Sequence, residues 1–140
     1  MAIERTLTII KPDAVEAGRL GDIIKIFEAN DFEIVAARLV NLTKKEAEGF
    51  YAVHRGKPFF ESLTTFMSSG RALAMVLEGE QVISRLREVM GATNPAKAAA
   101  GTIRHLYATN IERNAVHGSD ALETAAFEMG YFFPGIELAG

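Results

Sequence analysis

His117 is the residue of this sequence best suited to covalent chemistry, and it lies between a carboxamide at Asn114 and the pair Ser119-Asp120. A neutral imidazole carries a ring nitrogen that can attack phosphorus when an anion is held beside it. The apolar pair Ala115-Val116 predicts a short buried strand that ends at His117. Taken alone, however, a histidine in this setting is better explained as a partly buried residue that packs or caps.

The residues after His117 predict a turn followed directly by a helix. Gly118 lacks a Cβ and can adopt the backbone angles that a sharp turn needs. Ser119 and Asp120 are residue types that begin helices, and Glu123 completes a capping-box pattern with Asp120. The N–H groups and the dipole of such a helix favour an anion near its N-terminus, which would bring a phosphate close to the imidazole.

Polar side chains at other predicted element ends extend this pattern toward phosphate chemistry. Transfer of a phosphoryl group depends on positioning its oxygens and neutralising their charge. Arginine offers phosphate a planar fork of donors and lysine acts as a point charge, although on a solvated face either residue commonly has no such role. The candidate set is Lys11, Tyr51, Arg87, Thr93, Arg104, Asn114, Ser119 and Glu128. The sequence contains neither a P-loop nor the glycine pattern of a dinucleotide-binding fold.

Phe59 and Phe60 are adjacent, so they cannot both point into one core from a single helix face. One of them is therefore a candidate exposed aromatic residue that could stack on a planar ligand. The alternative is that neighbouring elements bury both rings.

The composition limits the kind of protein that this can be. With 140 residues, 49% of them hydrophobic and 24% charged, the chain fits one globular domain that spans residues 1–140. The absence of cysteine excludes disulfides and thiolate metal sites. A net charge of −3 gives no reason to expect nucleic-acid binding. No apolar run reaches a membrane-spanning length, and the N-terminus lacks the layout of a secretory signal, so we expect a cytoplasmic protein.

Four segments predict strands. Residues 3–10 and residues 32–40 are rich in strand-forming residues. The continuous apolar run of residues 72–77, which Gly79 ends, is typical of a strand that is covered on both faces. The fourth strand is the short one before His117.

Helices are predicted between these strands from apolar spacing at residues 20–27, 82–90 and 122–129 and from a capping box at Thr43 and Glu46. The last helix would face the core with Leu122, Ala125, Ala126 and Met129. Residues 91–113 show no periodicity, and a loop of this length is usually functional. The order is βαββαβ with additions. It predicts an α+β, ferredoxin-like fold in which helices pack on one face of a four-stranded antiparallel sheet, with a long active-site loop.

The sequence resembles the nucleoside diphosphate kinases over essentially its whole length. The segments that carry the resemblance are residues 4–7, 10–13, 58–60, 91–95, 101–104 and 114–120. The last segment corresponds to the family's signature around its active histidine and is highly specific. The sequence departs from the family pattern in two places. His105-Leu106 stand where a small residue and an aspartate are usual, and Arg71 stands where proline is common.

The resemblance implies a ping-pong exchange of the γ-phosphate between nucleoside triphosphates and diphosphates. His117 would be the nucleophile and would carry the phosphate on Nδ1. Glu128 and Ser119 would orient its ring. The side chains that would bind the phosphates are Lys11, Tyr51, Arg87, Thr93 and Arg104.

The resemblance also implies how the nucleoside, the metal ion and the assembly are arranged. Asn114, together with Lys11, would contact the sugar hydroxyls. Phe59 would stack on the base with Ile111 on the other side, an arrangement that tolerates purines and pyrimidines alike. Mg²⁺ would be held mainly by the nucleotide phosphates rather than by protein ligands. Family members are homo-oligomers built from dimers, so a tetramer or a hexamer is expected, without membrane or nucleic-acid partners.

Other functions stay open at this point. A non-catalytic nucleotide-binding relative would keep Phe59 and the arginines but tolerate the loss of His117 or Lys11, and both are present. A structural or regulatory protein-binding module cannot be separated from an enzyme by fold alone. Slow phosphatase activity would follow if water reached the phosphohistidine.

Overall fold

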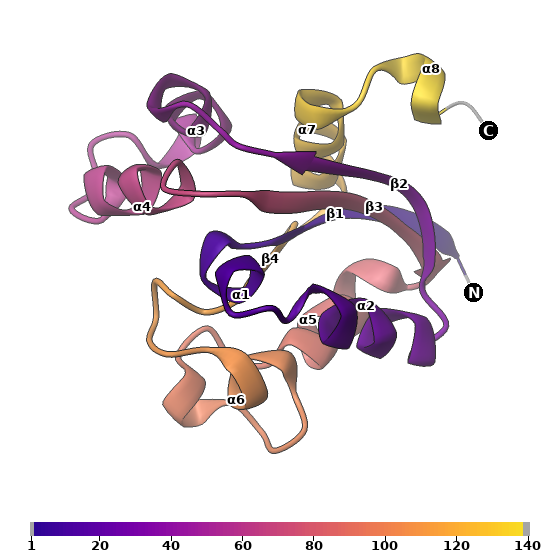
Figure 1. Ribbon diagram of the computed structural model, residues 1–140. Helices are drawn as coiled ribbons and strands as arrows, with labels where there is room; N and C mark the ends of the chain where they lie inside the picture. Colours follow the sequence, from indigo (N-terminus) through magenta and orange to yellow (C-terminus); the bar gives the residue numbers. More distant parts are fainter. Residues whose placement is uncertain (1, 139–140) are drawn as a thin grey trace.

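The computed structural model describes residues 2–138, and its central feature is a four-stranded antiparallel sheet (Figure 1). The strands are β1 (Ile3–Ile10), β2 (Glu33–Val40), β3 (Ala72–Glu80) and β4 (Val116–Gly118). Their order across the sheet is β2-β3-β1-β4, so that β1 and β3 are the two inner strands. The predicted α+β, ferredoxin-like arrangement is confirmed.

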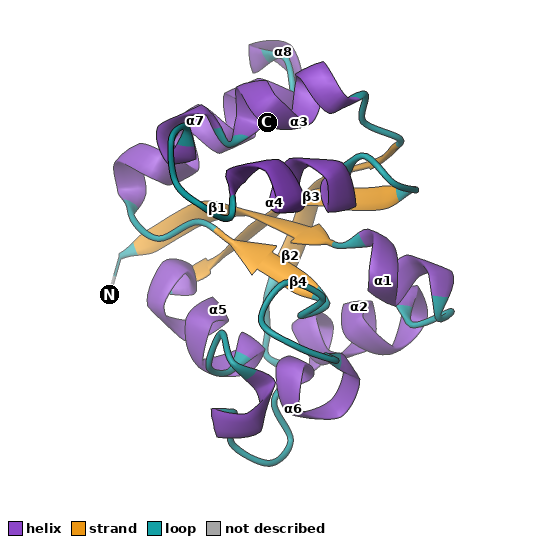
Figure 2. Cartoon of the chain, turned by 90° about the vertical axis from the view of Figure 1, so that its left-hand side faces the viewer, coloured by secondary structure: helices purple, strands orange, loops and turns teal. Residues whose placement is uncertain are grey.

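Helices cover both faces of this sheet, so the prediction of one covered face was wrong. The helices are α1 (Pro12–Glu16), α2 (Leu20–Ala29), α3 (Lys44–Phe50), α4 (Phe60–Met67), α5 (Val82–Met90), α6 (Ile103–Tyr107), α7 (Leu122–Phe132) and α8 (Gly135–Leu138), with 3-10 turns at Ala52–His54 and Pro95–Lys97. Figures 1 and 2 place α1, α2 and α5 on one side of the sheet and α3, α4 and α7 on the other. None of the helices among residues 2–138 has the length and apolar character needed to cross a lipid bilayer.

The inner strands explain the two layers, because their side chains alternate between two apolar cores. On β3, Met75 and Leu77 pack with α2 and α5, whereas Ala74 and Val76 pack with α3 and α4. Side chains that alternate in direction along a strand leave both faces of such a strand apolar, and each face then needs its own cover. The continuous apolar run that was predicted to be buried on both sides is confirmed by the burial of these residues.

The predicted inward face of α2 and the predicted start of α3 are confirmed. In α2, Ile23 and Phe27 are fully buried, one turn apart. At the start of α3, the hydroxyl of Thr43 accepts from the N–H of Glu46 at 3.1 Å, and the Glu46 carboxylate accepts from the N–H of Thr43 at 2.8 Å. These two reciprocal bonds satisfy N–H groups that the helix itself cannot pair.

Two sequence-based boundaries were wrong. β3 does not end at Gly79 but continues to Glu80, because Gly79 pairs with Glu4 in the ladder to β1. Residues 91–113 are not one irregular loop, since they contain a 3-10 turn and α6. Thr102 begins α6 by accepting from the N–H of His105 at 3.3 Å. These short helical pieces have too few turns to produce a readable apolar period.

The inward face of α7 also differs from the prediction. Ala125 is buried and Met129 packs against both cores, but Leu122 is 63% exposed and Ala126 faces solvent. Neighbouring helical residues point roughly 100° apart, and the inward face of α7 is narrow enough that Ala126 lies outside it. Leu122 is the first residue of the helix.

Candidate active site

β4 is an edge strand, and it holds His117 beside the inner strand β1. The strand has three residues, and His117 is the middle one, opposite Ile9 of β1. The Thr8 hydroxyl donates to the His117 carbonyl at 2.8 Å, which adds a side-chain bond to this pairing. His117 therefore lies inside the strand rather than at its end. The main-chain pairing with β1 therefore fixes the position of the His117 backbone, from which the imidazole extends.

Gly118 is needed for close packing and not for a sharp turn, so that prediction was wrong. It is the last residue of β4, and its φ is not among the positive values of the described residues. A Cβ at this position would come within 2.8 Å of Cε of Met90 and 3.0 Å of Cδ2 of Leu86. The side chains of Met90 and Leu86 would have to shift to admit a Cβ, and glycine lets α5 pack against the strand without that adjustment.

The backbone just before β4 is strained. Ala115 has φ of 73°, a left-handed conformation that costs an alanine about 1–2 kcal/mol. Its N–H donates to Oδ2 of Asp13 at 3.1 Å, and its carbonyl accepts from the N–H of Lys11 at 2.8 Å. Burial raises the pKa of Asp13, although the hydrogen bond from the N–H of Ala115 opposes the rise. Contacts from the segment after β1 thus hold the chain in the conformation that starts β4.

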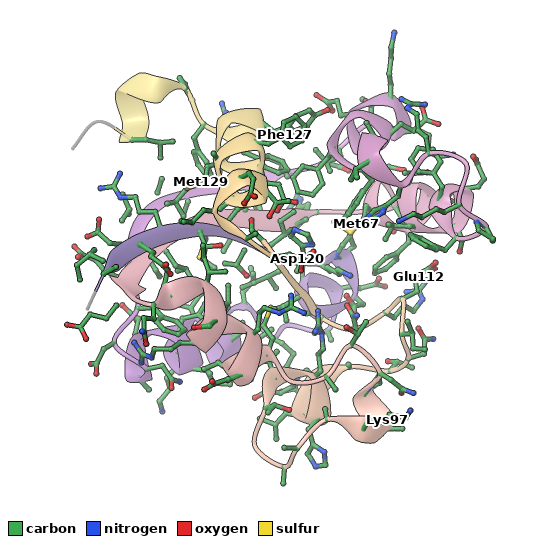
Figure 3. All side chains as sticks on the ribbon, turned by 180° about the vertical axis from the view of Figure 1, so that it is seen from behind. Met67, Lys97, Glu112, Asp120, Phe127 and Met129 are labelled. Atoms are coloured by element: carbon green, nitrogen blue, oxygen red, sulfur yellow. The ribbon has the colours of Figure 1, made fainter. Side chains whose placement is uncertain are left out.

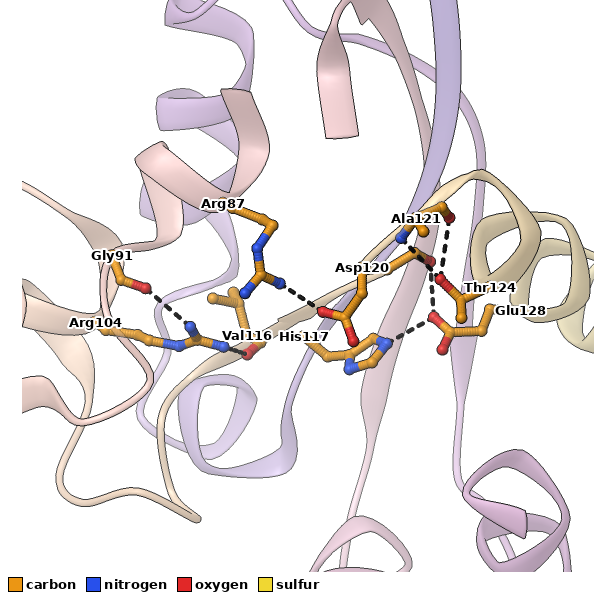
Figure 4. A network of polar contacts seen from close by, with 10 residues as sticks. Arg87, Gly91, Arg104, Val116, His117, Asp120, Ala121, Thr124 and Glu128 are labelled. Atoms are coloured by element: carbon orange, nitrogen blue, oxygen red, sulfur yellow. Dashed lines mark hydrogen bonds and ion pairs between the residues drawn. The ribbon is translucent and has the colours of Figure 1, made fainter. Parts of the chain in front are cut away.

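The imidazole of His117 is oriented by a carboxylate. Nε2 lies 2.7 Å from Oε1 of Glu128, and the hydroxyl of Ser119 donates to the same oxygen at 2.7 Å (Figure 4). The ring also meets Phe50 and Tyr51 edge-on, at centroid distances of 5.5 and 6.0 Å. An ionised carboxylate can only accept, so in the neutral imidazole this contact places the proton on Nε2 and the lone pair on Nδ1. Within residues 2–138, Nδ1 has no hydrogen-bond partner.

The prediction that Ser119 and Asp120 cap the helix after His117 was wrong. α7 begins at Leu122, and the N–H of Ala121 donates to Oγ1 of Thr124 at 2.9 Å. Ser119 and Asp120 do not cap this helix, because their side chains are used elsewhere. Ser119 bonds to Glu128, and Asp120 accepts from Nη1 of Arg87 at 2.6 Å.

Lys11 is a buried cation that joins two distant segments. Its Nζ donates to Oδ1 of Asn114 at 2.8 Å. Burial, and next the charge of Arg104, lower its pKa from 10.5 to about 8. The amide nitrogen of Asn114 donates to the carbonyl of Ile111 at 2.8 Å and to that of Thr93 at 3.4 Å. The Asn114 amide therefore links the cation to the loop before β4.

Arg104 is also nearly buried, with 8% of its surface exposed. Nη1 donates to the carbonyl of Gly91 at 2.9 Å and Nη2 to that of Val116 at 2.9 Å (Figure 4). Its Nε has no partner among the described residues. Burial, and then the charge of Arg87, lower the pKa of Arg104 to about 10, so it stays charged at neutral pH.

Tyr51 contacts the rings of His117 and His54, and its hydroxyl is buried. This hydroxyl has no hydrogen-bond partner within the described chain. Burial, and next the charge of Glu128, raise the pKa of Tyr51, so it stays protonated. A buried donor without a partner is costly, and a ligand oxygen would relieve that cost.

Most of the residues that were predicted to bind the nucleotide line one cleft of about 420 Å³. Its lining includes Lys11, Tyr51, Phe59, Arg87, Thr93, Arg104, Ile111, Asn114 and His117. Ser119 and Glu128 are not in the lining. Glu128 contacts His117, and Ser119 bonds to Glu128. Phe59 is 46% exposed and Phe60 is partly buried, which confirms that one ring of this pair faces outward.

The cleft also contains residues that the sequence analysis did not assign to ligand binding. They are His54, Leu63, Met90, Glu112, Gly118 and Asp120. His54 stacks on Tyr51 at 6.2 Å and meets Phe59 edge-on at 5.3 Å, and burial followed by the charge of Lys57 lowers its pKa. A 3-10 turn carries His54 into the cleft, and no sequence period indicates such a turn. Glu112 gave no signal either, because it lies in the stretch without periodicity.

The carboxylates of the described residues do not form a cluster of three or more that could hold a metal ion. Asp120 and Glu112 are single carboxylates on the cleft wall. Mg²⁺ prefers oxygen ligands and usually retains several waters, so a cation that enters with phosphate ligands of its own fits this donor set.

Comparison with known proteins assigns the chain to a family. A family model described as nucleoside diphosphate kinase matches residues 4–138. The chain is 59% identical over 138 residues to the nucleoside diphosphate kinase of Desulfosudis oleivorans and 58% identical to that of Nitratidesulfovibrio vulgaris strain DP4, with 99% of each chain covered in both cases. A crystal structure of the Aquifex aeolicus nucleoside diphosphate kinase superposes with a TM-score of 0.95 at 45% identity, covering 97% of this chain and 99% of that one. The chain therefore belongs to the nucleoside diphosphate kinase family, a family of phosphotransferases that act on nucleotides.

Proposed function

We propose that the γ-phosphoryl group passes through Nδ1 of His117 in two half-reactions. The observation that carries this proposal is the bond between Nε2 and Glu128, which leaves the lone pair of Nδ1 free in a ring that lines the cleft. In the first step, Nδ1 forms a bond to the γ-phosphorus while the bond to the β,γ-bridging oxygen breaks, and the nucleoside diphosphate leaves with that electron pair. In the second step, a terminal β-phosphate oxygen of the acceptor attacks the same phosphorus and Nδ1 departs.

Glu128 and Ser119 act in this proposal by positioning the ring. Positive charge develops on the imidazole as Nδ1 attacks, and the carboxylate 2.7 Å from Nε2 stabilises it. The Ser119 hydroxyl, which donates to the same oxygen, fixes the carboxylate in turn. Phe50 and Tyr51 hold the ring edge-on and limit its rotation.

The phosphates would be bound by cations that are already in place. Lys11 and Arg104 are held by hydrogen bonds before any ligand arrives, so little reorganisation is needed. Arg87 is exposed and paired with Asp120, so its guanidinium is free to exchange that partner for a phosphate. The hydroxyls of Tyr51 and Thr93 complete the set as neutral donors.

The nucleoside would lie at the other part of the cleft. Phe59 would stack on one face of the base and Ile111 would cover the other, and both side chains are exposed enough to do so. Asn114 and Lys11 would contact the sugar hydroxyls. Stacking depends little on base identity, which supports a kinase that uses purines and pyrimidines.

The family reaction uses a divalent cation, and we propose Mg²⁺, held mainly by the nucleotide phosphates and water. When bound, this ion neutralises charge on the transferred group. We also propose a cytoplasmic homo-oligomer built from dimers, a tetramer or a hexamer, with residues 1–140 as one catalytic domain. Light scattering coupled to sizing tests the assembly, and a monomer at micromolar concentration would refute it.

A pulse and chase tests the proposed reaction. The protein is incubated with γ-labelled ATP and Mg²⁺, isolated, and then mixed with unlabelled GDP, CDP or dTDP. We expect an acid-labile, alkali-stable phosphoprotein that passes its label to all three acceptors. A protein that binds ATP but never becomes labelled would contradict the role of His117.

A further inference from the structure

The slot proposed for the base has two walls, and one hydrogen bond ties them together. Phe59 stands at the start of α4 and Ile111 on the loop before β4. Ser62 lies one turn after Phe59, and Glu112 directly follows Ile111. The Ser62 hydroxyl donates to Oε2 of Glu112 at 2.6 Å, so this bond crosses from one wall to the other. Figure 3 shows Glu112 on the loop beside the α3–α4 pair.

The loop that carries Glu112 is held from several sides. Oδ1 of Asn110 accepts from the N–H groups of Glu112 at 3.0 Å and Arg113 at 2.8 Å. The carbonyl of Ile111 accepts from Asn114. The guanidinium of Arg113 lies over the ring of Phe66, at 4.9 Å. The turn therefore presents Glu112 to the cleft in a fixed backbone conformation.

The carboxylate of Glu112 has unused acceptor capacity. Its Oε2 receives the Ser62 hydroxyl, and among the described residues no donor reaches Oε1. A carboxylate offers about four lone-pair sites. The Glu112 charge also contributes to the field at Lys11, where it raises the lysine pKa against the larger effect of burial. Glu112 thus belongs electrostatically to the same cleft.

A base between Phe59 and Ile111 has both faces covered, so a group that bridges the two walls can meet only its edge. The Watson–Crick edge of guanine presents two adjacent N–H donors, which fit the two oxygens of a carboxylate. Adenine and cytosine present one amino group there. Thymine and uracil present a single N–H between two carbonyl oxygens, and these oxygens repel a carboxylate.

We propose that Glu112 is a specificity-determining residue, which favours nucleotides whose base has an amino edge, guanine above all, over thymine and uracil. This inference rests on the proposed binding of the nucleotide in this cleft. Stacking alone would give the enzyme little preference among bases, and Glu112 would add a preference through the edge of the base. Ser62 is a positioning residue, because it holds the carboxylate across the slot.

The test is the discharge of isolated labelled phosphoenzyme by dGDP, dADP, dCDP and dTDP, each below saturation. We expect dGDP to discharge the wild-type protein fastest and dTDP slowest, with a spread of about 3- to 10-fold for a partly exposed charged acceptor. Glu112→Gln keeps the size of the side chain but removes its charge, and Glu112→Ala removes the acceptor. Both should bring the dGDP to dTDP ratio close to one, and Ser62→Ala should lower it in part.

Glu123→Gln is the matched control, because it removes the same charge from an exposed residue outside the cleft. Its ratio should equal that of the wild type. An unchanged ratio in both Glu112 variants would overturn the inference while the labelled histidine stands, and so would an equal fall in rate with all four acceptors. A wild-type protein that forms no labelled intermediate would overturn the proposed function itself.

Discussion

Lys11 donates from Nζ to Oδ1 of Asn114 at 2.8 Å in the protein interior, across 103 residues of sequence. The pair couples the end of β1 to the segment that leads into β4. The hydrogen bond to Asn114 also holds the Lys11 ammonium group in a buried position, where burial disfavours the charged form. Asn114 is neutral, so it can accept from this cation without cancelling the charge that a phosphate would meet.

The pKa of Lys11 predicts an alkaline limit to activity. Burial lowers this pKa to about 8, so the free enzyme loses the charge above that pH, and kcat/KM should fall there. kcat should hold to higher pH, because bound phosphates favour the charged form. Lys11→Arg keeps the charge, so the alkaline fall of kcat/KM should move to higher pH even if the rate is lower. If kcat/KM of the Lys11→Arg variant falls at the same pH as that of the wild type, the titration belongs to another group.

Stability should respond to the same titration in the opposite direction. Between about pH 8 and 10 the folded state binds fewer protons at Lys11 than the unfolded state, whose lysine titrates near 10.5. Stability from this group therefore rises with pH in that window. Urea unfolding at pH 7.5 and 9.5, in wild type and in Lys11→Met, separates this effect from others. The expectation would be contradicted if the free energy of unfolding rises between the two pH values by no more in the wild type than in the variant.

His117→Ala and Glu128→Gln should differ in kind. The first should abolish both labelling and turnover, since no nucleophile remains. The second keeps an acceptor for Nε2–H but loses the negative charge, so we expect labelling to persist at a rate lowered by roughly 10- to 100-fold. Single-turnover labelling measures both variants. Substantial exchange by His117→Ala would rule out His117 as the nucleophile.

Phe59→Ala should weaken the binding of every nucleotide by a similar amount. Loss of stacking costs about 1–3 kcal/mol per base and depends little on which base is lost. Dissociation constants for ADP, GDP, CDP and dTDP measure it, and melting of the free protein is the control, because Phe59 is 46% exposed. A loss confined to one base would indicate a different contact.

Arg104→Ala should damage both activity and stability. The sequence alone indicated only a phosphate contact, but the structure adds two hydrogen bonds to the carbonyls of Gly91 and Val116. Leaving buried carbonyls without donors costs about 1–3 kcal/mol each. We expect a loss of about 2–4 kcal/mol in the free energy of unfolding, beside a large fall in kcat. Unfolding in urea with ADP absent measures the structural part, and an unchanged midpoint would exclude it.

Much of the architecture could be predicted from local patterns. The stripe containing Ile23 and Phe27, the capping box at Thr43 and the apolar run of β3 each depend on nearby residues, and each is found in the structure. The short α6 and the 3-10 turn within residues 91–113 escaped prediction because they are too brief to show a period.

The errors near His117 have a different origin. Ser119 and Asp120 have the chemistry of helix caps, but Glu128 and Arg87 take their side chains, and so the helix begins later. Gly118 was interpreted as a turn residue, whereas its role is set by the approach of Met90. Local rules failed where distant residues compete for the same atoms. Glu112 and His54 could not be found from the sequence, because only tertiary structure brings them to the cleft.

The pairing of β4 with β1 has a consequence for how the enzyme acquires its activity. Thr8 and Ile9 belong to the first strand, while Gly118 and His117 come more than a hundred residues later. Closing so long a loop is entropically costly, so contacts of this kind tend to form late in folding. The imidazole is then aligned only when the final strand docks. Regain of catalysis after dilution from denaturant should lag behind regain of helical signal, which makes turnover a reporter of the last folding step.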